Sequence, residues 1–242
     1  MIIKNNLDVM QEQKILSVII PVYNEEKTII EILKKINNNK IENIKYQIIV
    51  INDGSKDDTL NLLKKNDHLY QHLLDYNNNR GKGFAVRNGL KIAKGDYVIF
   101  QDADLEYDPK DYDKFINLFI NFDADVILGS RFNYSEYTRS HNFFNKIGNY
   151  FITFFFNILF NTTFTDIYCC YLAFKRDLLV VDNIKTTGFE QHAEILCSLK
   201  RNSKKLYEVS INYNGRSVEE GKKIRFYHIF KVILIILFRR FI

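Results

Sequence analysis

Two aspartates separated by a single residue, Asp102 and Asp104, come just after the apolar run Tyr97–Phe100. Carboxylates at this spacing can converge on one hard divalent cation and leave coordination positions open for phosphate oxygens. Such a cation neutralises charge on a leaving diphosphate without any proton transfer. Glu106, two residues further on, can add an oxygen. The bare pattern is also typical of a capped turn, but its place after a buried strand favours a cation site.

Two other polar turns follow apolar runs and offer groups to a nucleotide. The turn after Ile51 can place Asp53 on a base or ribose, while Ser55 or Asp57 can cap the helix that follows. Arg80–Gly83 is a basic loop with glycines that opens a helix, which suits a diphosphate. The sequence has no Walker-type lysine loop and no Gly-x-Gly-x-x-Gly pattern, which argues against kinases and dinucleotide-dependent dehydrogenases.

These turns need a sheet that brings them to one edge, and the sequence pattern predicts an α/β fold. Near-continuous apolar runs alternate with helix-period segments, which is typical of a mostly parallel central sheet with helices on both faces. Because ligands of such sheets bind outside the carboxyl ends of the strands, we expect the turns to face one crevice. The predicted strands are Leu16–Val22, Tyr46–Ile51, Tyr70–Leu74, Tyr97–Phe100, Asp125–Leu128, Tyr171–Lys175 and Leu206–Tyr213. The predicted helices are Glu26–Ile36, Asp57–Lys65, Gly83–Ala93, Asp111–Asn121, Asn145–Phe160 and Glu190–Lys200.

The 242 residues carry a formal net charge of +5, and basic residues gather after Leu199. A basic end suits phosphate groups, anionic lipid headgroups or nucleic acid, and equally a solvated surface. The three cysteines, Cys169, Cys170 and Cys197, lack metal-type spacing and predict a reducing compartment. No secretory signal is evident, and the aliphatic run Val232–Phe238 is far shorter than the roughly 20 residues that span a bilayer. We therefore expect a cytoplasmic protein that does not cross a membrane.

The ordered set of motifs resembles family-2 glycosyltransferases of the GT-A fold, close to dolichyl-phosphate mannose synthases and their bacterial polyprenyl-phosphate relatives. The matching segments are Ser17–Ile29, Val50–Thr59, Arg80–Leu90, Gly95–Pro109, Val126–Phe132, Thr165–Leu179, Gly188–Ile195 and Ile211–Ile224. The resemblance implies one GT-A domain over residues 1–224, with a Rossmann-like nucleotide-binding half. It also implies an inverting transfer of a sugar from a GDP- or UDP-linked donor to an acceptor, above all a polyprenyl phosphate.

The same resemblance implies roles for single residues. The donor nucleotide-sugar would be held by Pro21, Tyr23, Glu25, Asp53, Ser55, Lys82, Asp102, Arg216 and Lys222. Mg²⁺ or Mn²⁺ would be bound by Asp102, Asp104 and Glu106. The acceptor phosphate would face Arg131, together with Arg139.

The acceptor decides whether a catalytic base is needed. A phosphate oxygen is already anionic near neutral pH, so positioning, metal neutralisation and arginines would carry the reaction. A sugar hydroxyl would instead require a carboxylate base, for which Asp166, Glu190 and Glu194 are the candidates. Cys169 stands where the family usually has a small polar residue and Leu172 where it often has Lys, which leaves acceptor identity open.

Single histidines and cysteines favour the simpler interpretation. His141 and His192 are interpreted as structural or surface residues rather than catalysts, although His192 aligns as well as its acidic neighbours with the acidic position of the family. The cysteines are interpreted as small buried residues.

The segment Arg225–Ile242 places apolar side chains at helical spacing between basic ends. A short amphipathic helix of this kind suits the membrane interface, and Phe151–Phe160 offers a second contact. A helix docked on the domain's own core is the alternative. We expect peripheral membrane association with a lipid-phosphate acceptor and no nucleic-acid partner.

Three other functions remain open. One is transfer to a sugar hydroxyl in cell-surface glycan synthesis, and another is a nucleotide-sugar-binding subunit without turnover. A nucleotidyltransferase would need a glycine-rich basic loop after the first strand, where this chain has Tyr23-Asn24-Glu25.

Overall fold

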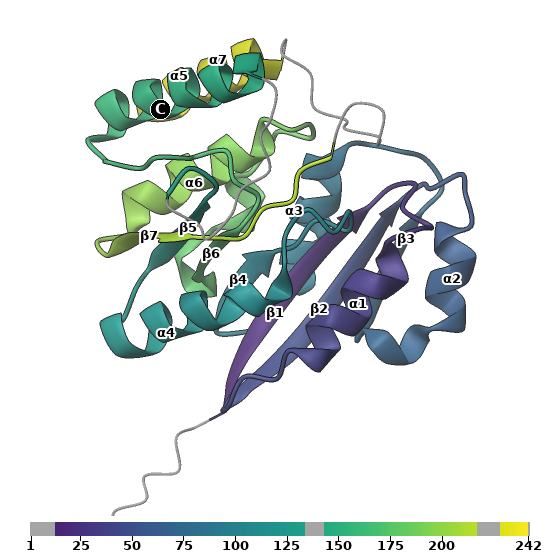
Figure 1. Ribbon diagram of the computed structural model, residues 1–242. Helices are drawn as coiled ribbons and strands as arrows, with labels where there is room; N and C mark the ends of the chain where they lie inside the picture. Colours follow the sequence, from purple (N-terminus) through teal and green to yellow (C-terminus); the bar gives the residue numbers. More distant parts are fainter. Residues whose placement is uncertain (1–12, 134–142, 217–227, 242) are drawn as a thin grey trace, which may run out of the picture.

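The computed structural model describes residues 13–133, 143–216 and 228–241, and its centre is a mixed seven-stranded sheet (Figure 1). The strands are β1 (Lys14–Val22), β2 (Ile44–Asp53), β3 (His72–Tyr76), β4 (Tyr97–Phe100), β5 (Val126–Ser130), β6 (Leu172–Lys175) and β7 (Leu206–Ser210). Their order in the sheet is β3-β2-β1-β4-β6-β5-β7. All neighbouring pairs are parallel except those of β6, which runs antiparallel to β4 and β5. The predicted α/β fold with a mostly parallel sheet is confirmed.

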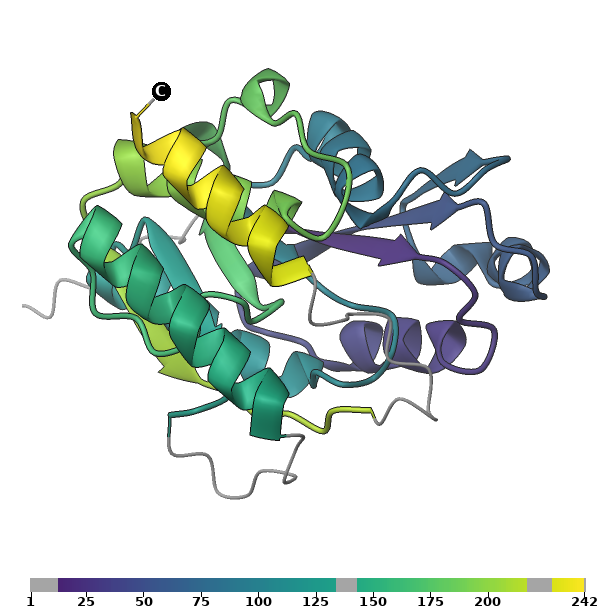
Figure 2. The same cartoon turned by 90° about the horizontal axis from the view of Figure 1, so that it is seen from above.

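Helices cover both faces of the sheet, as Figure 2 shows from above. The helices are α1 (Ile29–Asn38), α2 (Thr59–Lys65), α3 (Lys82–Ile92), α4 (Tyr112–Phe122), α5 (Phe143–Phe160), α6 (Gln191–Asn202) and α7 (His228–Phe241). Short 3-10 turns lie at Asp67–Leu69, Pro109–Asp111, Arg176–Leu178 and Val181–Asn183. Helices α1 and α4 lie on one face and α3 and α6 on the other, so the central strands β1 and β4 are buried from both sides.

Several predicted boundaries moved by a few residues, and two of them moved for a clear local reason. Helix α1 begins at Ile29 rather than at residue 26, because Glu25 and the residues around it form a turn in which Thr28 and Ile29 donate their backbone N–H to the Glu25 carbonyl. Strand β7 ends at Ser210, and Tyr213 instead forms an isolated bridge with Tyr107. Both departures bring polar turns toward the carboxyl edge of the sheet.

The C-terminal helix α7 packs against α5 and α6, and the α5–α7 pair forms a separate layer beyond the sheet (Figures 1 and 2). Val232 and Ile236 are fully buried in this packing. The inner face of α7 is therefore docked on the domain, which is the alternative to a helix that lies only in the membrane interface. Among the described helices, none is both long enough and apolar enough to cross a bilayer.

Candidate active site

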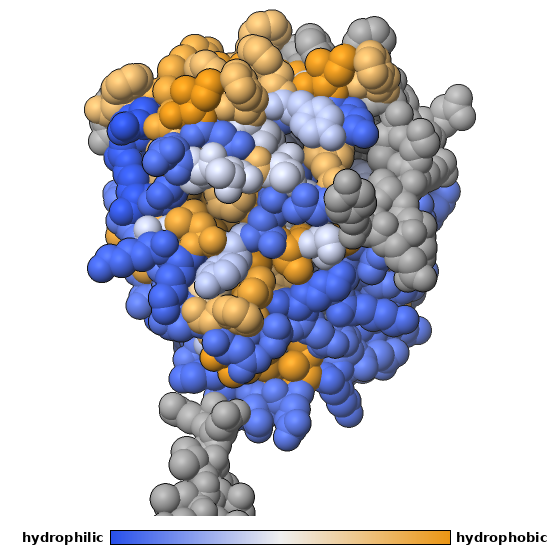
Figure 3. All heavy atoms as spheres, turned by 60° about the vertical axis from the view of Figure 1, so that its left-hand side comes forward, coloured by the Kyte–Doolittle hydropathy of each residue, from blue (hydrophilic) through white to orange (hydrophobic). Residues whose placement is uncertain are grey.

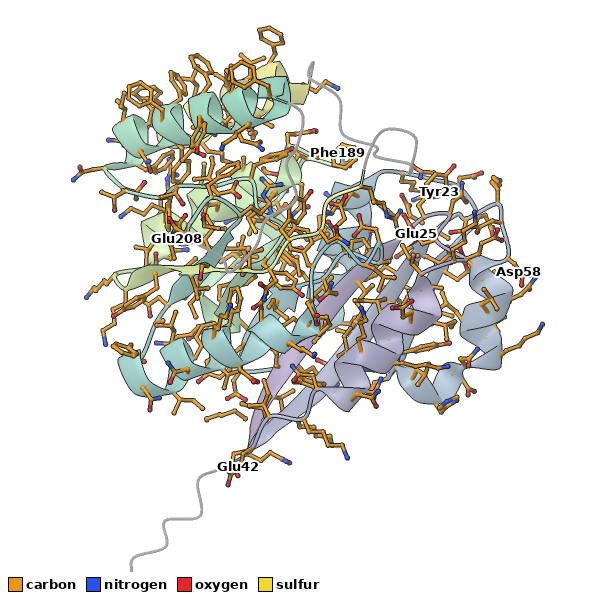
Figure 4. The ribbon with its side chains drawn as sticks, in the orientation of Figure 1. Tyr23, Glu25, Glu42, Asp58, Phe189 and Glu208 are labelled. Carbon is orange, nitrogen blue, oxygen red and sulfur yellow. The ribbon has the colours of Figure 1, made fainter. Side chains whose placement is uncertain are left out.

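A cavity of about 410 Å³ opens at the carboxyl ends of β1, β2 and β4, where the three polar turns meet. Its walls come from eight segments of the chain. The lining residues are Pro21, Val22, Tyr23, Glu25, Asp53, Asn79, Gly81, Lys82, Ala85, Asp102, Ala103, Asp104, Glu106, Tyr107, Arg131, Tyr168, Cys170, Phe189, Gln191, His192, Tyr213 and Arg216. In Figure 4, Tyr23 and Glu25 lie at the end of β1, and Phe189 lies across from them beneath the α5–α7 layer.

Asp53 organises the loop that precedes α3. Its buried carboxylate accepts hydrogen bonds from the backbone N–H of Arg80 (3.0 and 3.1 Å) and of Gly81 (2.8 Å). Gly81 has φ of +101°, and a Cβ there would lie 2.4 Å from the carbonyl oxygen of Thr187, so only glycine fits. In the structure the Asp53 carboxylate holds the Arg80–Gly81 backbone. Its contact with a base or ribose stays a prediction.

Ser55 lies outside the cavity lining, in a set of hydrogen bonds that ties the first two polar turns together. Its Oγ accepts from the Asn24 N–H at 3.0 Å, and the Asn24 side chain accepts from Lys56 N–H at 2.7 Å. Asp57 accepts from the Glu26 N–H at 3.1 Å. Ser55 therefore shapes the turn that carries the lining residues Tyr23 and Glu25.

Lys82 at the start of α3 forms an ion pair with Asp102, with 2.5 Å between Nζ and Oδ1. Burial disfavours the charged form of both side chains, but their mutual attraction and hydrogen bond outweigh the effect of burial. The pKa of Lys82 is therefore raised and the pKa of Asp102 is lowered. The Asp102 turn is held from below by Gln101, whose buried amide donates to the Asp102 carbonyl and accepts from two tyrosine hydroxyls, those of Tyr112 and Tyr171. Lysine and aspartate are thus fixed side by side where a diphosphate would lie.

Asp104, unlike Asp102, forms no ion pair with a basic side chain of the described residues, and it accepts fewer hydrogen bonds from them than Glu106 does. Burial, together with the charges of Asp102 and Glu106, raises the pKa of Asp104 to about 7. Its side chain accepts one hydrogen bond, from the Glu106 N–H at 3.2 Å. Crowded carboxylates of this kind suit a divalent cation that takes its remaining ligands from a phosphate. Among the described residues, no group of three or more His, Cys, Asp or Glu side chains is arranged as a complete metal site.

Arg216 closes one side of the cavity. Its guanidinium pairs with Glu25 (3.0 Å) and donates to the carbonyl of Asp104 at 2.7 and 3.0 Å. Glu106 accepts from the Arg216 N–H (2.6 Å) and from the Tyr213 hydroxyl (2.9 Å). Glu106 thus holds the 213–216 segment against the site, and its role as a metal ligand stays a prediction.

Arg131 forms a two-pronged ion pair with the fully buried Asp166. Nε and Nη2 donate to the carboxylate at 2.6 and 2.8 Å, and the Arg131 backbone N–H adds a third bond at 3.1 Å. Arg131 lines the cavity and Asp166 does not. Asp166 therefore positions Arg131.

The carboxylates of the other two candidate bases, Glu190 and Glu194, accept hydrogen bonds from nearby groups. Glu190 accepts from the nearby Gly188 N–H, and Glu194 accepts from Lys185, Thr186 and Arg239. Neither is among the lining residues of the described chain. Arg139 and Lys222 lie outside the described residues.

The structure adds lining residues that the sequence analysis did not assign to the site. Tyr107, Tyr168 and Tyr213 bring aromatic rings, and Cys170 places its Sγ 3.9 Å from Nζ of Lys82. All three cysteines are free and buried, as expected. Gln191 and His192 line the cavity from the first turn of α6, so His192 is a residue of the site as well as of the fold. The alignment of His192 with an acidic position was the one sequence signal for it.

A large apolar surface covers the outer side of the α5–α7 layer, at the top of the view in Figure 3. We call it the α5–α7 apolar face. Its exposed side chains are Phe143, Ile147, Tyr150, Phe151, Phe154, Ile158, Phe230, Leu234, Phe238 and Phe241. Exposed contiguous apolar surface of this kind marks contact with a partner or a membrane.

Comparison with known proteins identifies the family of the chain. The family model "Glycosyl transferase family 2" matches residues 17–181. The UDP-N-acetylglucosamine–dolichyl-phosphate N-acetylglucosaminyltransferase of Methanococcus voltae is 28% identical, over 87% of this chain and 91% of that protein. The dolichyl-phosphate beta-glucosyltransferase of Dictyostelium discoideum is 29% identical, over 82% of this chain and 66% of that one.

The fold has a solved counterpart in glucosyl-3-phosphoglycerate synthase of Mycobacterium tuberculosis, determined in complex with Mn²⁺, UDP and glucosyl-3-phosphoglycerate. The TM-score is 0.68 at 17% identity, and the match covers 95% of this chain and 81% of that one. This likeness shows the fold, and the family model, which matches more than half of the chain, shows the family: the chain belongs to glycosyl transferase family 2.

Proposed function

We propose that this glycosyltransferase moves a hexosyl group from a nucleoside diphosphate sugar to a polyprenyl phosphate at a membrane surface. The observation that carries the proposal is the state of the three candidate bases. Asp166 is bound to Arg131, and neither Glu190 nor Glu194 is among the residues that line the cavity. An acceptor phosphate needs no base, so a cavity that none of these three carboxylates lines, and that Arg131 does line, suits it.

The residues divide the work as follows. Lys82 and Arg216 stabilise the diphosphate, which leaves with the electrons of the bond to the anomeric carbon. Arg131 attracts the acceptor phosphate and holds it for in-line attack on that carbon, which inverts the configuration. Asp166 fixes the guanidinium in place. The anionic phosphate oxygen carries no proton to remove.

Asp102 and Asp104 would hold the metal, Mg²⁺ or Mn²⁺. The raised pKa of Asp104, caused by burial and by two neighbouring carboxylates, fits a site that is short of positive charge. A bound cation would supply neutralisation of the leaving diphosphate. The relative with UDP-linked N-acetylglucosamine and the neighbour with UDP support a UDP-linked donor over a GDP-linked one.

The α5–α7 apolar face supports peripheral attachment to the bilayer. Phe154, Phe230 and Phe238 are more than half exposed, and exposed Lys146 and Lys231 lie on the same two helices, where they can reach lipid headgroups. The free thiols suit a reducing compartment, so we place the reaction at the cytoplasmic side. The relatives named for dolichyl phosphate support a lipid-linked acceptor.

The test is a panel of donors and acceptors scored by product mass. UDP-glucose, UDP-N-acetylglucosamine and GDP-mannose are each incubated with Mn²⁺ and a short polyprenyl phosphate, and in parallel with the matching polyprenol. We expect a glycosyl-phosphate product with at least one donor and no product with the alcohol. Transfer to a sugar hydroxyl acceptor, with none to the polyprenyl phosphate, would favour glycan synthesis on sugar acceptors instead.

A further inference from the structure

Two buried nitrogens in the cavity wall have no hydrogen-bond partner. In the part of the chain that the structure describes, three buried side-chain N or O atoms are unpaired: Nε2 of Gln191, Nε2 of His192 and Oγ of Ser203. Two of the three are neighbours in sequence, and both of those residues line the cavity. A buried polar group without a partner destabilises the fold, and a ligand that pairs with these two side chains of the cavity wall would remove that cost.

The fold holds these two residues against the donor side of the cavity. Gln191 and His192 begin α6, and Gln191 packs on the first turn of α3, beside Lys82. A Cβ added at Gly83 would lie 2.7 Å from the Cβ of Gln191, so the glycine permits the close approach of the two helices. The ring of Tyr168 lies edge-on to the imidazole, with 6.0 Å between centroids.

His192 is within electrostatic reach of both ion pairs of the site. It interacts electrostatically with Lys82 and Asp102 on the diphosphate side and with Arg131 and Asp166 on the acceptor side. Burial, followed by the charge of Lys82, lowers the pKa of His192 to about 4, so the imidazole is neutral at pH 7. A neutral polar group suits an uncharged ligand. In an in-line transfer, the uncharged group between the leaving diphosphate and the attacking acceptor is the sugar.

We propose that the amide of Gln191 and the imidazole of His192 bind oxygen atoms of the transferred hexosyl group and so select the sugar of the donor. This inference rests on the proposed function and assigns the sugar part of the same site. The Nε2 of glutamine is a donor and that of neutral histidine is a donor or an acceptor, which together match the hydroxyl and acetamido groups of hexoses.

The experiment compares binding of a nucleoside diphosphate with binding of its sugar conjugate. Calorimetry on the wild type with UDP, UDP-glucose, UDP-N-acetylglucosamine, GDP and GDP-mannose first selects the nucleotide and the sugar that bind best. The same titrations follow on Gln191→Met, which keeps the volume and removes the amide, and on His192→Phe. We expect each variant to bind the sugar conjugate roughly tenfold more weakly while its affinity for the bare nucleotide stays within about twofold.

Thermal unfolding of the ligand-free proteins separates this role from a structural one. Replacing an unpaired buried amide by an apolar side chain removes a destabilising group, so Gln191→Met should raise Tm by roughly 2–4 °C. Ser203→Ala is the matched control: it removes the third unpaired atom, which lies away from the cavity lining, and should leave both affinities unchanged.

Three results decide the matter. A selective loss for the sugar conjugate supports the assignment. Equal losses for nucleotide and conjugate, or no loss in either variant while the wild type binds and transfers, would overturn the assignment and leave the proposed function intact. A wild type that binds none of the five nucleotides would overturn the proposed function, and this inference with it.

Discussion

The two halves of the cavity are built in different ways. On the donor side, at the ends of β2, β1 and β4, backbone groups help to fix the polar turns, as the amides of Arg80 and Gly81 do with Asp53, beside the ion pairs of Lys82 and Arg216. On the acceptor side, between β5 and α7, the buried charges pair with one another across long stretches of sequence, as Arg131 does with Asp166. The exposed aromatic rings of the α5–α7 apolar face also belong to this half.

The difference shows which part of the site is ready before substrate binds. A nucleoside diphosphate is a common ligand, and a rigid set of turns can bind it in the same way in many transferases. A lipid-linked acceptor approaches from a bilayer, so the acceptor side needs a surface that contacts lipid and charges that face it. We therefore expect substitutions on the two sides to affect different substrates.

The largest effect is expected at Asp104. Asp104→Asn should lower kcat by roughly a thousandfold or more, because it removes a metal ligand and with it several kcal/mol of leaving-group stabilisation. The fold should survive, since the side chain makes a single hydrogen bond. Asp113→Asn, at an exposed position of α4, is the control and should keep full activity. Activity that persists in EDTA would contradict the metal assignment.

The next effect concerns the α5–α7 apolar face. Phe154→Ser with Phe230→Ser should weaken partition onto anionic vesicles by roughly a hundredfold, because each exposed phenylalanine contributes about 1.5–3 kcal/mol on burial. Sedimentation with vesicles at low salt measures the change. Phe122→Ser, an equally apolar exposed position on α4, should leave binding intact. A wild-type protein that stays in the supernatant would exclude membrane attachment.

Point substitutions on the α5–α7 apolar face test membrane binding more directly than deletion of α7 does. Val232 and Ile236 are buried against the neighbouring helices, so deleting the helix would open the core as well as remove the contact with lipid. Phe154 and Phe230 are more than 60% exposed and carry little of the fold. Their loss therefore reports on the surface alone.

A smaller effect is expected at Arg131. Lysine keeps the charge but loses the two-pronged geometry. Arg131→Lys should raise the KM for polyprenyl phosphate roughly tenfold and leave nucleotide affinity within about twofold. Arg87→Lys, on α3 and outside the cavity lining, is the matched control. An equal loss of nucleotide affinity would assign Arg131 to the donor side.

The sequence predicted the donor side better than the acceptor side for a physical reason. Strands such as Tyr97–Phe100 follow from local apolar runs, and the turns after them carry their own polar residues, so position along the chain also gives position in space. The reversed direction of β6 and the pairing of Arg131 with Asp166 depend on contacts between distant segments. Such contacts leave little trace in local sequence pattern. The same holds for Gln191, which enters the site because α6 packs on Gly83.

The smallest effect on activity is expected for the ion pair that joins α7 to α6. The same ion pair should have a clear effect on stability. Arg239 pairs with Glu194, which is fully buried and also accepts from the backbone of Lys185 and Thr186. Burial acts to raise the pKa of Glu194, but the hydrogen bonds from Arg239 and Thr186 outweigh it and lower that pKa below its usual value. A lowered carboxyl pKa stabilises the fold above the unfolded-state pKa of about 4.3, and this contribution is lost as pH falls through the folded-state value.

Arg239→Met leaves the buried Glu194 carboxylate without its cation, so its pKa should rise and the free energy of unfolding at pH 7 should fall by about 1–3 kcal/mol. As pH falls below about 4, Glu194 becomes protonated in both proteins, and their difference should shrink. Urea unfolding at pH 7 and at pH 3.5 measures both quantities, and Arg240→Met on the next, exposed position of α7 is the control. A stability difference that does not change with pH would mean that Arg239 acts through packing rather than through the charge of Glu194. Nucleotide affinity should stay unchanged in either case, because neither Glu194 nor Arg239 is among the residues that line the cavity.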